Sequence, residues 1–212
     1  DQIIAMVPTT AFFADDPDAG QRLEDHSAQI TALAYAPNGD LYSADQSGII
    51  FHWDIDGNLL EIMQTNNVPI TALAVSGNGQ LASGSVDGTV WRWDAGEPTT
   101  LLTLAHPISD LAWSTQGHLA IATGDGIAGW VQNAALIELP TGGTRVAWNP
   151  GGDQLAVGDA LGRVTAWDVT TITPTINDAG AHSQPVTALR WTDAYLVSAG
   201  LDGRVVVRHQ TS

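Results

Sequence analysis

The chain has 212 residues, of which 44% are hydrophobic and 14% charged. This composition is too apolar and too weakly charged for a disordered chain, and no apolar run approaches the ~18 residues of a membrane-spanning helix. The absence of cysteine excludes disulfides, thiolate catalysis and zinc–cysteine sites. The net charge of −16 arises because lysine is absent and seven arginines face 23 acidic residues. Such a chain lacks the basic surface that binds nucleic acid or anionic lipid, so we expect neither as a partner, nor membrane insertion.

Residues 1–20 are predicted to be an N-terminal extension. Ile3–Val7 is a short apolar run with the character of a strand, and residues 15–20 (DDPDAG) form an acidic linker. Two roles are open: the extension lies on the rest of the molecule, or it donates a strand to a neighbouring molecule. The composition leaves the compartment open, with an extracellular or envelope location among the alternatives.

From residue 21 onward, the sequence repeats at intervals of about 40 residues, a period typical of stacked supersecondary units. Aligned hydroxyl residues mark the copies at spacings of 40, 38, 35 and 43 residues: Thr31, Thr71, Ser109, Thr144 and Thr187. The predicted repeats cover residues 26–65, 66–104, 105–139, 140–178 and 179–212. Residues 21–212 are therefore predicted to form one repeat domain.

The second copy shows what each repeat builds. Ile70–Val75, Leu81–Ser85, Thr89–Trp93 and Thr100–Leu104 are predicted strands, separated by tight turns such as Gly77-Asn78-Gly79. The unit is a four-stranded antiparallel meander that cannot bury both of its faces alone. Stacking such sheets around an axis solves this problem, so we predict an all-β protein with the architecture of a β-propeller.

The closing dipeptide of three repeats resembles that of the WD-repeat (WD-40, β-transducin-type) family. Trp53-Asp54, Trp93-Asp94 and Trp167-Asp168 match it. The third and fifth copies depart, with Val131 and Arg208-His209 in its place. The resemblance covers about residues 20–212 and implies a propeller, in which the five repeats would form five four-stranded blades.

The resemblance also implies a buried polar network in each blade, made of a histidine, a second-strand Ser or Thr, a turn aspartate and a third-strand tryptophan. The matching residues are His26, Ser43 and Trp53 in the first copy, Ser83, Asp87 and Trp93 in the second, His106, Thr123, Asp125 and Trp130 in the third, and His182, Ser198 and Asp202 in the fifth. In the first copy Ser47 replaces the turn aspartate, and in the second Asn67 replaces the histidine. Buried imidazole and carboxylate groups need partners, which is the physical reason for such a set.

These sets also have the composition of a hydrolytic triad. Because they recur from blade to blade, whereas a catalytic set is expected once, we interpret them as structural. We predict no catalytic residues, no metal ligands and no cofactor.

Tryptophans at equivalent first-strand positions are predicted to pack between sheets, since the position recurs as an aromatic residue in most copies: Tyr35, Trp113, Trp148 and Trp191. Trp91 is unique to its copy and is the candidate for an exposed partner contact, although packing is the favoured alternative.

The ends of the chain predict how the propeller closes. The fifth copy ends after its third strand, and residues 21–26 precede the first copy where a fourth strand is expected. We predict that residues 21–26 pair with Arg204–Arg208. Three assemblies are open: a closed five-bladed ring, an open ring completed by another chain or a second copy, or part of a longer propeller.

The predicted function is a non-enzymatic scaffold for protein–protein interactions, self-assembling or a subunit of a larger complex. The alternative is a propeller enzyme or a protein that binds a small ligand or carbohydrate on its axial face. The scaffold is favoured because no copy contributes an unmatched pair of acids to the axis.

Overall fold

The computed structural model describes residues 4–6, 21–65, 67–132, 135–178 and 180–209. Within these ranges the chain forms strands, turns and bends, without a helix. The strands in chain order are β1 (Ile4–Met6), β2 (Gln21–Leu23), β3 (Ile30–Tyr35), β4 (Leu41–Asp45), β5 (Ile49–Trp53), β6 (Leu59–Gln64), β7 (Ile70–Val75), β8 (Leu81–Ser85), β9 (Thr89–Asp94), β10 (Glu97–Thr103), β11 (Ile108–Trp113), β12 (Leu119–Thr123), β13 (Ala128–Gln132), β14 (Ala135–Glu138), β15 (Arg145–Trp148), β16 (Gln154–Gly158), β17 (Val164–Asp168), β18 (Thr173–Asp178), β19 (Val186–Trp191), β20 (Tyr195–Gly200) and β21 (Val205–His209).

Strands that follow one another in the chain are hydrogen-bonded neighbours in each sheet. Sheets 1 to 4 consist of β3–β6, β7–β10, β11–β14 and β15–β18, and sheet 5 consists of β19–β21. All pairs are antiparallel, and β1 and β2 form a separate two-stranded pair. The prediction of antiparallel meanders is confirmed, with three strands described in the last one.

The strand bounds predicted for the second repeat hold for its first two strands and fail for the fourth. That strand begins at Glu97 instead of Thr100, because Ala95 and Gly96 adopt φ values of 50° and 80°. Positive φ at both central residues is typical of a two-residue hairpin turn. This turn lets Glu97 pair directly with Asp94.

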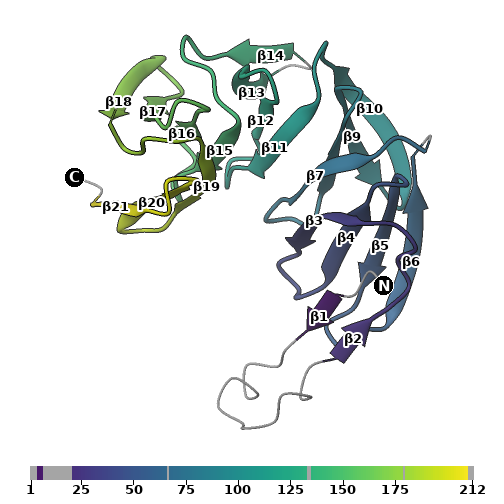
Figure 1. Ribbon diagram of the computed structural model, residues 1–212. Helices are drawn as coiled ribbons and strands as arrows, with labels where there is room; N and C mark the ends of the chain where they lie inside the picture. Colours follow the sequence, from purple (N-terminus) through teal and green to yellow (C-terminus); the bar gives the residue numbers. More distant parts are fainter. Residues whose placement is uncertain (1–3, 7–20, 66, 133–134, 179, 210–212) are drawn as a thin grey trace, which may run out of the picture.

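The five sheets stand side by side around an axis, with their first strands innermost and their fourth strands at the rim (Figure 1). The inner strands β3, β7, β11, β15 and β19 contact one another in this order. Sheets 1 and 5 lie at the two ends of an open arc (Figure 1). The β-propeller architecture predicted from the repeats is therefore confirmed.

The apolar core lies between neighbouring sheets, because each sheet has two apolar faces. We call the face toward the following sheet the forward face and the face toward the preceding sheet the backward face. At the first interface, Leu73 and Trp93 on the backward face of sheet 2 pack against Ala32 and Ala44 on the forward face of sheet 1. Alanine on one face makes room for the larger residue on the other, and each large side chain buried in this way contributes about 1.5–3 kcal/mol.

The N-terminal segment differs from the predicted closure. β2 pairs with β1, with Ile4 opposite Leu23, and β21 pairs with β20 alone. The predicted pairing of residues 21–26 with Arg204–Arg208 is therefore absent from this arrangement. The physical reason is distance along the arc. β1 can pair with β2 while the arc stays open, whereas β21 lies in the sheet at the other end and would meet β2 only if the arc closed. The predicted acidic linker, residues 15–20, lies outside the described residues.

Candidate functional site

The fifth repeat brings its three predicted polar residues together. Nδ1 of His182 lies 3.1 Å from Oδ1 of Asp202, and Nε2 lies 2.8 Å from Oγ of Ser198. The backbone N–H of Ser183 donates to the other oxygen of Asp202 at 3.0 Å. The side chain of His182 is fully buried and that of Asp202 is 4% exposed.

The first repeat builds the same network with a residue that the sequence analysis missed. Nδ1 of His26 lies 2.7 Å from Oδ2 of Asp45, and Nε2 lies 2.7 Å from Oγ of Ser43. Trp53 donates its indole N–H to the same Ser43 oxygen at 2.8 Å. Asp45, two residues before the expected turn position, supplies the carboxylate, and Ser47 donates to it. Asp45 is the sole acid between Leu41 and the turn glycine, a signal that was available in the sequence.

Hydrogen bonds also explain the acidity of these aspartates. Burial raises the pKa of Asp45, but donors from Ser47, His26 and the backbone of Ile49 outweigh it and hold the pKa below its ordinary value. Burial also raises the pKa of Asp202. Hydrogen bonds from the backbone N–H groups of Ser183 and Arg204 and from His182 outweigh this effect, so the pKa of Asp202 is lowered. Both carboxylates are thereby stabilised in their charged form.

The second repeat assembles only part of the predicted set. The indole N–H of Trp93 donates to Oγ of Ser83 at 2.8 Å. Asp87 instead accepts hydrogen bonds from Ser85 and from the backbone N–H of Thr89, which closes its own turn.

The third repeat was predicted to match the family pattern most fully, and the structure contradicts this prediction. His106 and Asp125 form an ion pair of 3.0 Å, but their side chains are 45% and 36% exposed. Trp130 pairs with Ala120, whereas Trp93 pairs with the first residue of its neighbouring strand, so Trp130 is displaced by one residue. A shift of one residue moves a side chain to the opposite face of a strand.

The same register explains the place of Thr123. It ends its strand, and the buried Ile121 takes the position that Ser43 and Ser83 hold in the first two sheets. The hydroxyl of Thr123 donates to Asp125 and accepts the backbone N–H of Ile127, so these hydrogen bonds close its own turn. The set His106, Thr123, Asp125 and Trp130 is thus not one network.

The arrangement of Ser198, His182 and Asp202 has the connectivity of a hydrolytic triad, with a hydroxyl on one imidazole nitrogen and a carboxylate on the other. Its burial argues for a structural role, because a nucleophile must reach its substrate. Ser198 lies on β20 within sheet 5 and is 3% exposed. The recurrence of this geometry around His26 supports the same interpretation.

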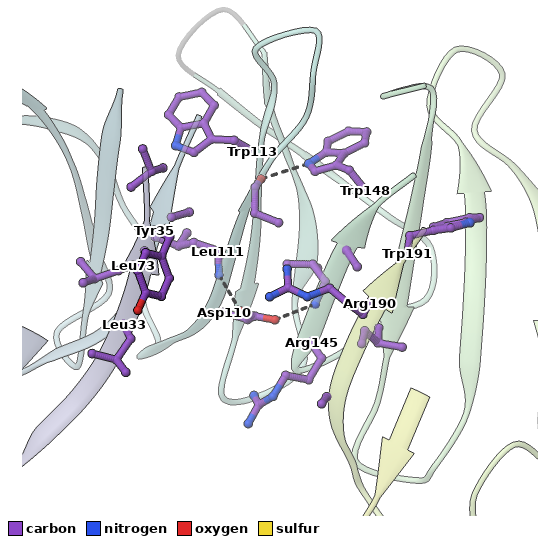
Figure 2. Close-up of a pocket in the computed structure, with 18 of the residues that line it drawn as sticks. Leu33, Tyr35, Leu73, Asp110, Leu111, Trp113, Arg145, Trp148, Arg190 and Trp191 are labelled. Carbon is purple, nitrogen blue, oxygen red and sulfur yellow. Dashed lines mark hydrogen bonds between the residues drawn. The ribbon is translucent and has the colours of Figure 1, made fainter. Parts of the chain in front are cut away.

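A cavity of about 730 Å³ lies on the axis, lined by the inner strands of all five sheets (Figure 2). Register with the second strand of each sheet aligns Asp110 and Arg145 with Ala32, Ala72 and Ala188, so this position is alanine in three sheets and charged in two. Two residues further along, four sheets have alanine and one has Arg190. These three charged residues come from the consecutive sheets 3, 4 and 5, so the cavity is polar on one side.

Asp110 and Arg145 connect neighbouring sheets. Asp110 accepts hydrogen bonds from the backbone N–H groups of Val146 and Leu111, both at 3.0 Å (Figure 2). Burial raises the pKa of Asp110, and the opposing effects of the Val146 N–H and of the Arg145 charge do not restore it. Arg145 donates to the carbonyl oxygen of Thr187 at 2.8 Å, which ties sheet 4 to sheet 5.

Arg190 is exposed in the cavity and is the third charged residue there. None of these three residues was predicted from the sequence, although each replaces a residue that is alanine in most repeats. A charged residue at a position that is alanine in the other repeats is the sequence feature from which these three residues could have been predicted.

The prediction that the aromatic residues of the inner strands pack between sheets holds for the tryptophans and fails for Tyr35, which is 61% exposed because none of the described sheets covers the backward face of sheet 1. Trp148 and Trp191 are buried, and Trp148 donates its indole N–H to the carbonyl oxygen of Ala112 in the preceding sheet at 3.0 Å. Trp91, the candidate for an exposed contact, is 7% exposed and packs in the core between sheets 1 and 2. It is therefore a packing residue, because its side chain points toward sheet 1 and away from solvent.

Across residues 4–6 and 21–209, apart from the few positions that are not described, no group of three or more His, Asp or Glu side chains is placed to hold a metal ion. In the same part of the chain, no helix is long and apolar enough to cross a membrane.

Comparison with known proteins gives matches in sequence and in structure. The family model "WD domain, G-beta repeat" matches residues 19–54 and 57–94. Meiotic fizzy-related protein 1 of Schizosaccharomyces pombe is 32% identical over 105 residues, which are 47% of this chain and 24% of that protein. Cell division cycle 20.4, cofactor of APC complex, of Arabidopsis thaliana is 31% identical over 103 residues, 45% of this chain and 23% of that protein. The chain thus matches about a quarter of the length of these relatives.

Solved structures match over most of the chain. The computationally designed Ika8 protein is similar with a TM-score of 0.75 and 26% identity, over 90% of this chain and 62% of that one. The β-propeller domain of Myceliophteria_thermophila Cps50 (Swd1) has a TM-score of 0.74 and 19% identity, over 86% of this chain and 66% of that one. The resemblance to the WD-repeat family is therefore confirmed, with the repeat model matched in the first two repeats and a β-propeller architecture along the described chain.

Proposed function

We propose that this protein is a non-enzymatic scaffold that binds another protein through its axial cavity, on the side formed by sheets 3 to 5. The observation that supports this proposal is the exposed guanidinium of Arg190 at a position where the other four sheets have alanine. In a chain with a net charge of −16, an exposed cation in the cavity is suited to a carboxylate on a partner's segment.

The surroundings of Arg190 fit such a segment. Leu189 and Trp191 flank it on β19, and Arg145 lies on the neighbouring inner strand. Arginine and aromatic residues are enriched where proteins bind one another. The relatives include a protein whose name describes it as a cofactor of APC complex, which is consistent with a role in binding other proteins.

The acid content of the cavity lining argues against the alternative of a glycan-cleaving propeller. Such enzymes use a pair of acids about 5–9.5 Å apart. Among the residues that line the cavity, Asp110 is the one acid, and its two oxygens already accept backbone hydrogen bonds.

The test is capture of a partner by the immobilised chain from its own source, quantified by mass spectrometry, followed by native mass spectrometry of the purified complex. We expect Arg190→Glu to reduce capture at least about tenfold, because it reverses the charge presented to the partner. Arg92→Glu is the matched control, since Arg92 lies on β9 outside the cavity and pairs with Asp94. Equal capture by both variants would contradict the proposed surface, and turnover of a substrate that is lost in Asp110→Asn would contradict the scaffold.

A further inference from the structure

The forward face of sheet 5 corresponds to an inter-sheet interface, and none of the described residues packs on it as a following sheet would. By strand register, Val205 is equivalent to Ile50, Val90, Ala128 and Val164 in the other sheets. Those four side chains are at most 1% exposed, because the next sheet covers them. Val205 is 66% exposed.

The backward face of sheet 1 has the complementary property. Leu33 is equivalent to Leu73, Leu111 and Val146, which are at most 8% exposed where the preceding sheet covers them. Leu33 is 52% exposed, and Tyr35 beside it is 61% exposed. The two ends of the arc therefore present the two halves of the contact that the chain makes between each pair of its neighbouring sheets.

The N-terminal strand completes this correspondence. Leu23 packs on Leu41, Phe51 and Trp53 of sheet 1, just as Met63 of β6 packs on the equivalent residues of sheet 2. β2 thus lies where the fourth strand of a preceding sheet would lie. Sheet 5 is the sheet without a fourth strand among the described residues.

The charges of the two end sheets are also complementary. Residues 30–64, which form sheet 1, contain five acidic residues and no basic ones. Residues 186–209, which form sheet 5, contain three arginines and two acidic residues. In a chain with seven basic residues in all, this places net positive charge at one end and strong negative charge at the other.

We propose that a second copy of this chain docks head to tail, with the backward face of its sheet 1 on the forward face of sheet 5. In the docked pair, Leu33 and Tyr35 of one copy cover Val205 and Val207 of the other, and β2 pairs with the neighbour's β21 in place of β1. The contact continues the internal packing of the arc, which is the strongest reason to choose a second copy as the occupant. Because the two faces differ, each copy retains one free face and association can continue beyond the dimer.

The inference goes beyond the proposed scaffold function, although the two surfaces adjoin: Leu33 and Tyr35 also line the axial cavity, and Arg190 is in register with Val197 and Val207 on the forward face of sheet 5. The molar mass of the purified chain measures self-association in the absence of any other protein, so the two proposals can fail separately.

The test is the molar mass of the 212-residue chain by size-exclusion chromatography with light scattering, over a range of concentrations. We expect a mass that rises with concentration above the 22.2 kDa of one chain. Val205→Glu and Leu33→Glu should each weaken association at least about tenfold, because each buries an unpaired charge in the contact. Val86→Glu is the matched control, since Val86 is also exposed but lies in a turn of sheet 2.

A mixing experiment tests the head-to-tail geometry. Val205→Glu blocks one face and Leu33→Glu the other, so an equimolar mixture should form a dimer and stop there, while each variant alone stays monomeric. Both positions are exposed in the single chain, and the circular dichroism of both variants should match that of the wild type. A wild type that stays at 22.2 kDa at every concentration, or a mixture that stays monomeric, would overturn the proposal.

Discussion

Removing the hydroxyl of Ser198 tests whether the buried histidine network stabilises the fold. In Ser198→Ala, Nε2 of His182 loses the partner that lies 2.8 Å away, inside a site where the imidazole is fully buried. A buried polar group without a partner costs about 1–3 kcal/mol. We therefore expect the free energy of unfolding to fall by about 2 kcal/mol, which lowers the melting temperature by about 4–8 °C for a protein of this size.

The assay is urea unfolding followed by tryptophan fluorescence, with thermal melts by circular dichroism. Ser183→Ala is the matched control, because Ser183 is exposed and contacts Asp202 through its backbone N–H, which the substitution keeps. That variant should lie within about 0.5 kcal/mol of the wild type. If both variants have the same stability as the wild type, the network contributes nothing measurable and the structural interpretation fails.

Three further substitutions probe the fold. Asp45→Ala leaves His26 and two backbone N–H groups without their buried acceptor, so the free energy of unfolding should fall by about 3 kcal/mol in urea melts, and an unchanged value would contradict the network in sheet 1. Trp91→Ala should lower the free energy of unfolding by about 3–5 kcal/mol in the same assay, since Trp91 is a core residue. Unchanged stability together with a loss of partner binding would instead identify Trp91 as a partner-contact residue. Hydrogen bonds from Thr170 and Thr171 lower the pKa of Asp168 to about 2, below its ordinary 3.8. The charged carboxylate of Asp168 therefore contributes to the free energy of unfolding above pH 3.8, and this contribution is lost as the pH falls toward 2. Asp168→Asn should therefore flatten the acid-side loss of stability between pH 3.8 and 2, measured by urea melts across that range, and an unchanged slope would contradict the lowered pKa.

Part of the polar network could be derived from the sequence, and part could not. The set around His182 follows from the order of residues, because a histidine before the sheet and an aspartate in the turn meet wherever the strands keep their usual register. In the third repeat this condition is not met for the tryptophan. Trp130 is one residue out of register, which places its side chain on the opposite face of the sheet. Asp45 was missed because a carboxylate at the end of one strand can reach the position that a turn residue occupies in other repeats.

The axial cavity was less accessible to sequence reasoning. Asp110, Arg145 and Arg190 are far apart in the chain, and only the stacking of sheets 3, 4 and 5 brings them to one side of the cavity. Their presence at positions otherwise held by alanine was visible in the repeat alignment. Their shared environment depends on how neighbouring sheets pack.

The sequence by itself determined the repeat, the antiparallel meander and the propeller architecture. These follow from alternating apolar residues, turn glycines and the need of a two-faced sheet for neighbours, which are all local or periodic properties of the chain. Only the tertiary structure decided which strand lies next to β2 and which side chains remain exposed at the ends of the arc. Val205 and Val164 occupy equivalent positions in their repeats, and the difference in exposure between them depends on whether another sheet stands in front. No pattern within one repeat contains that information, because it is a property of where the stack of sheets stops.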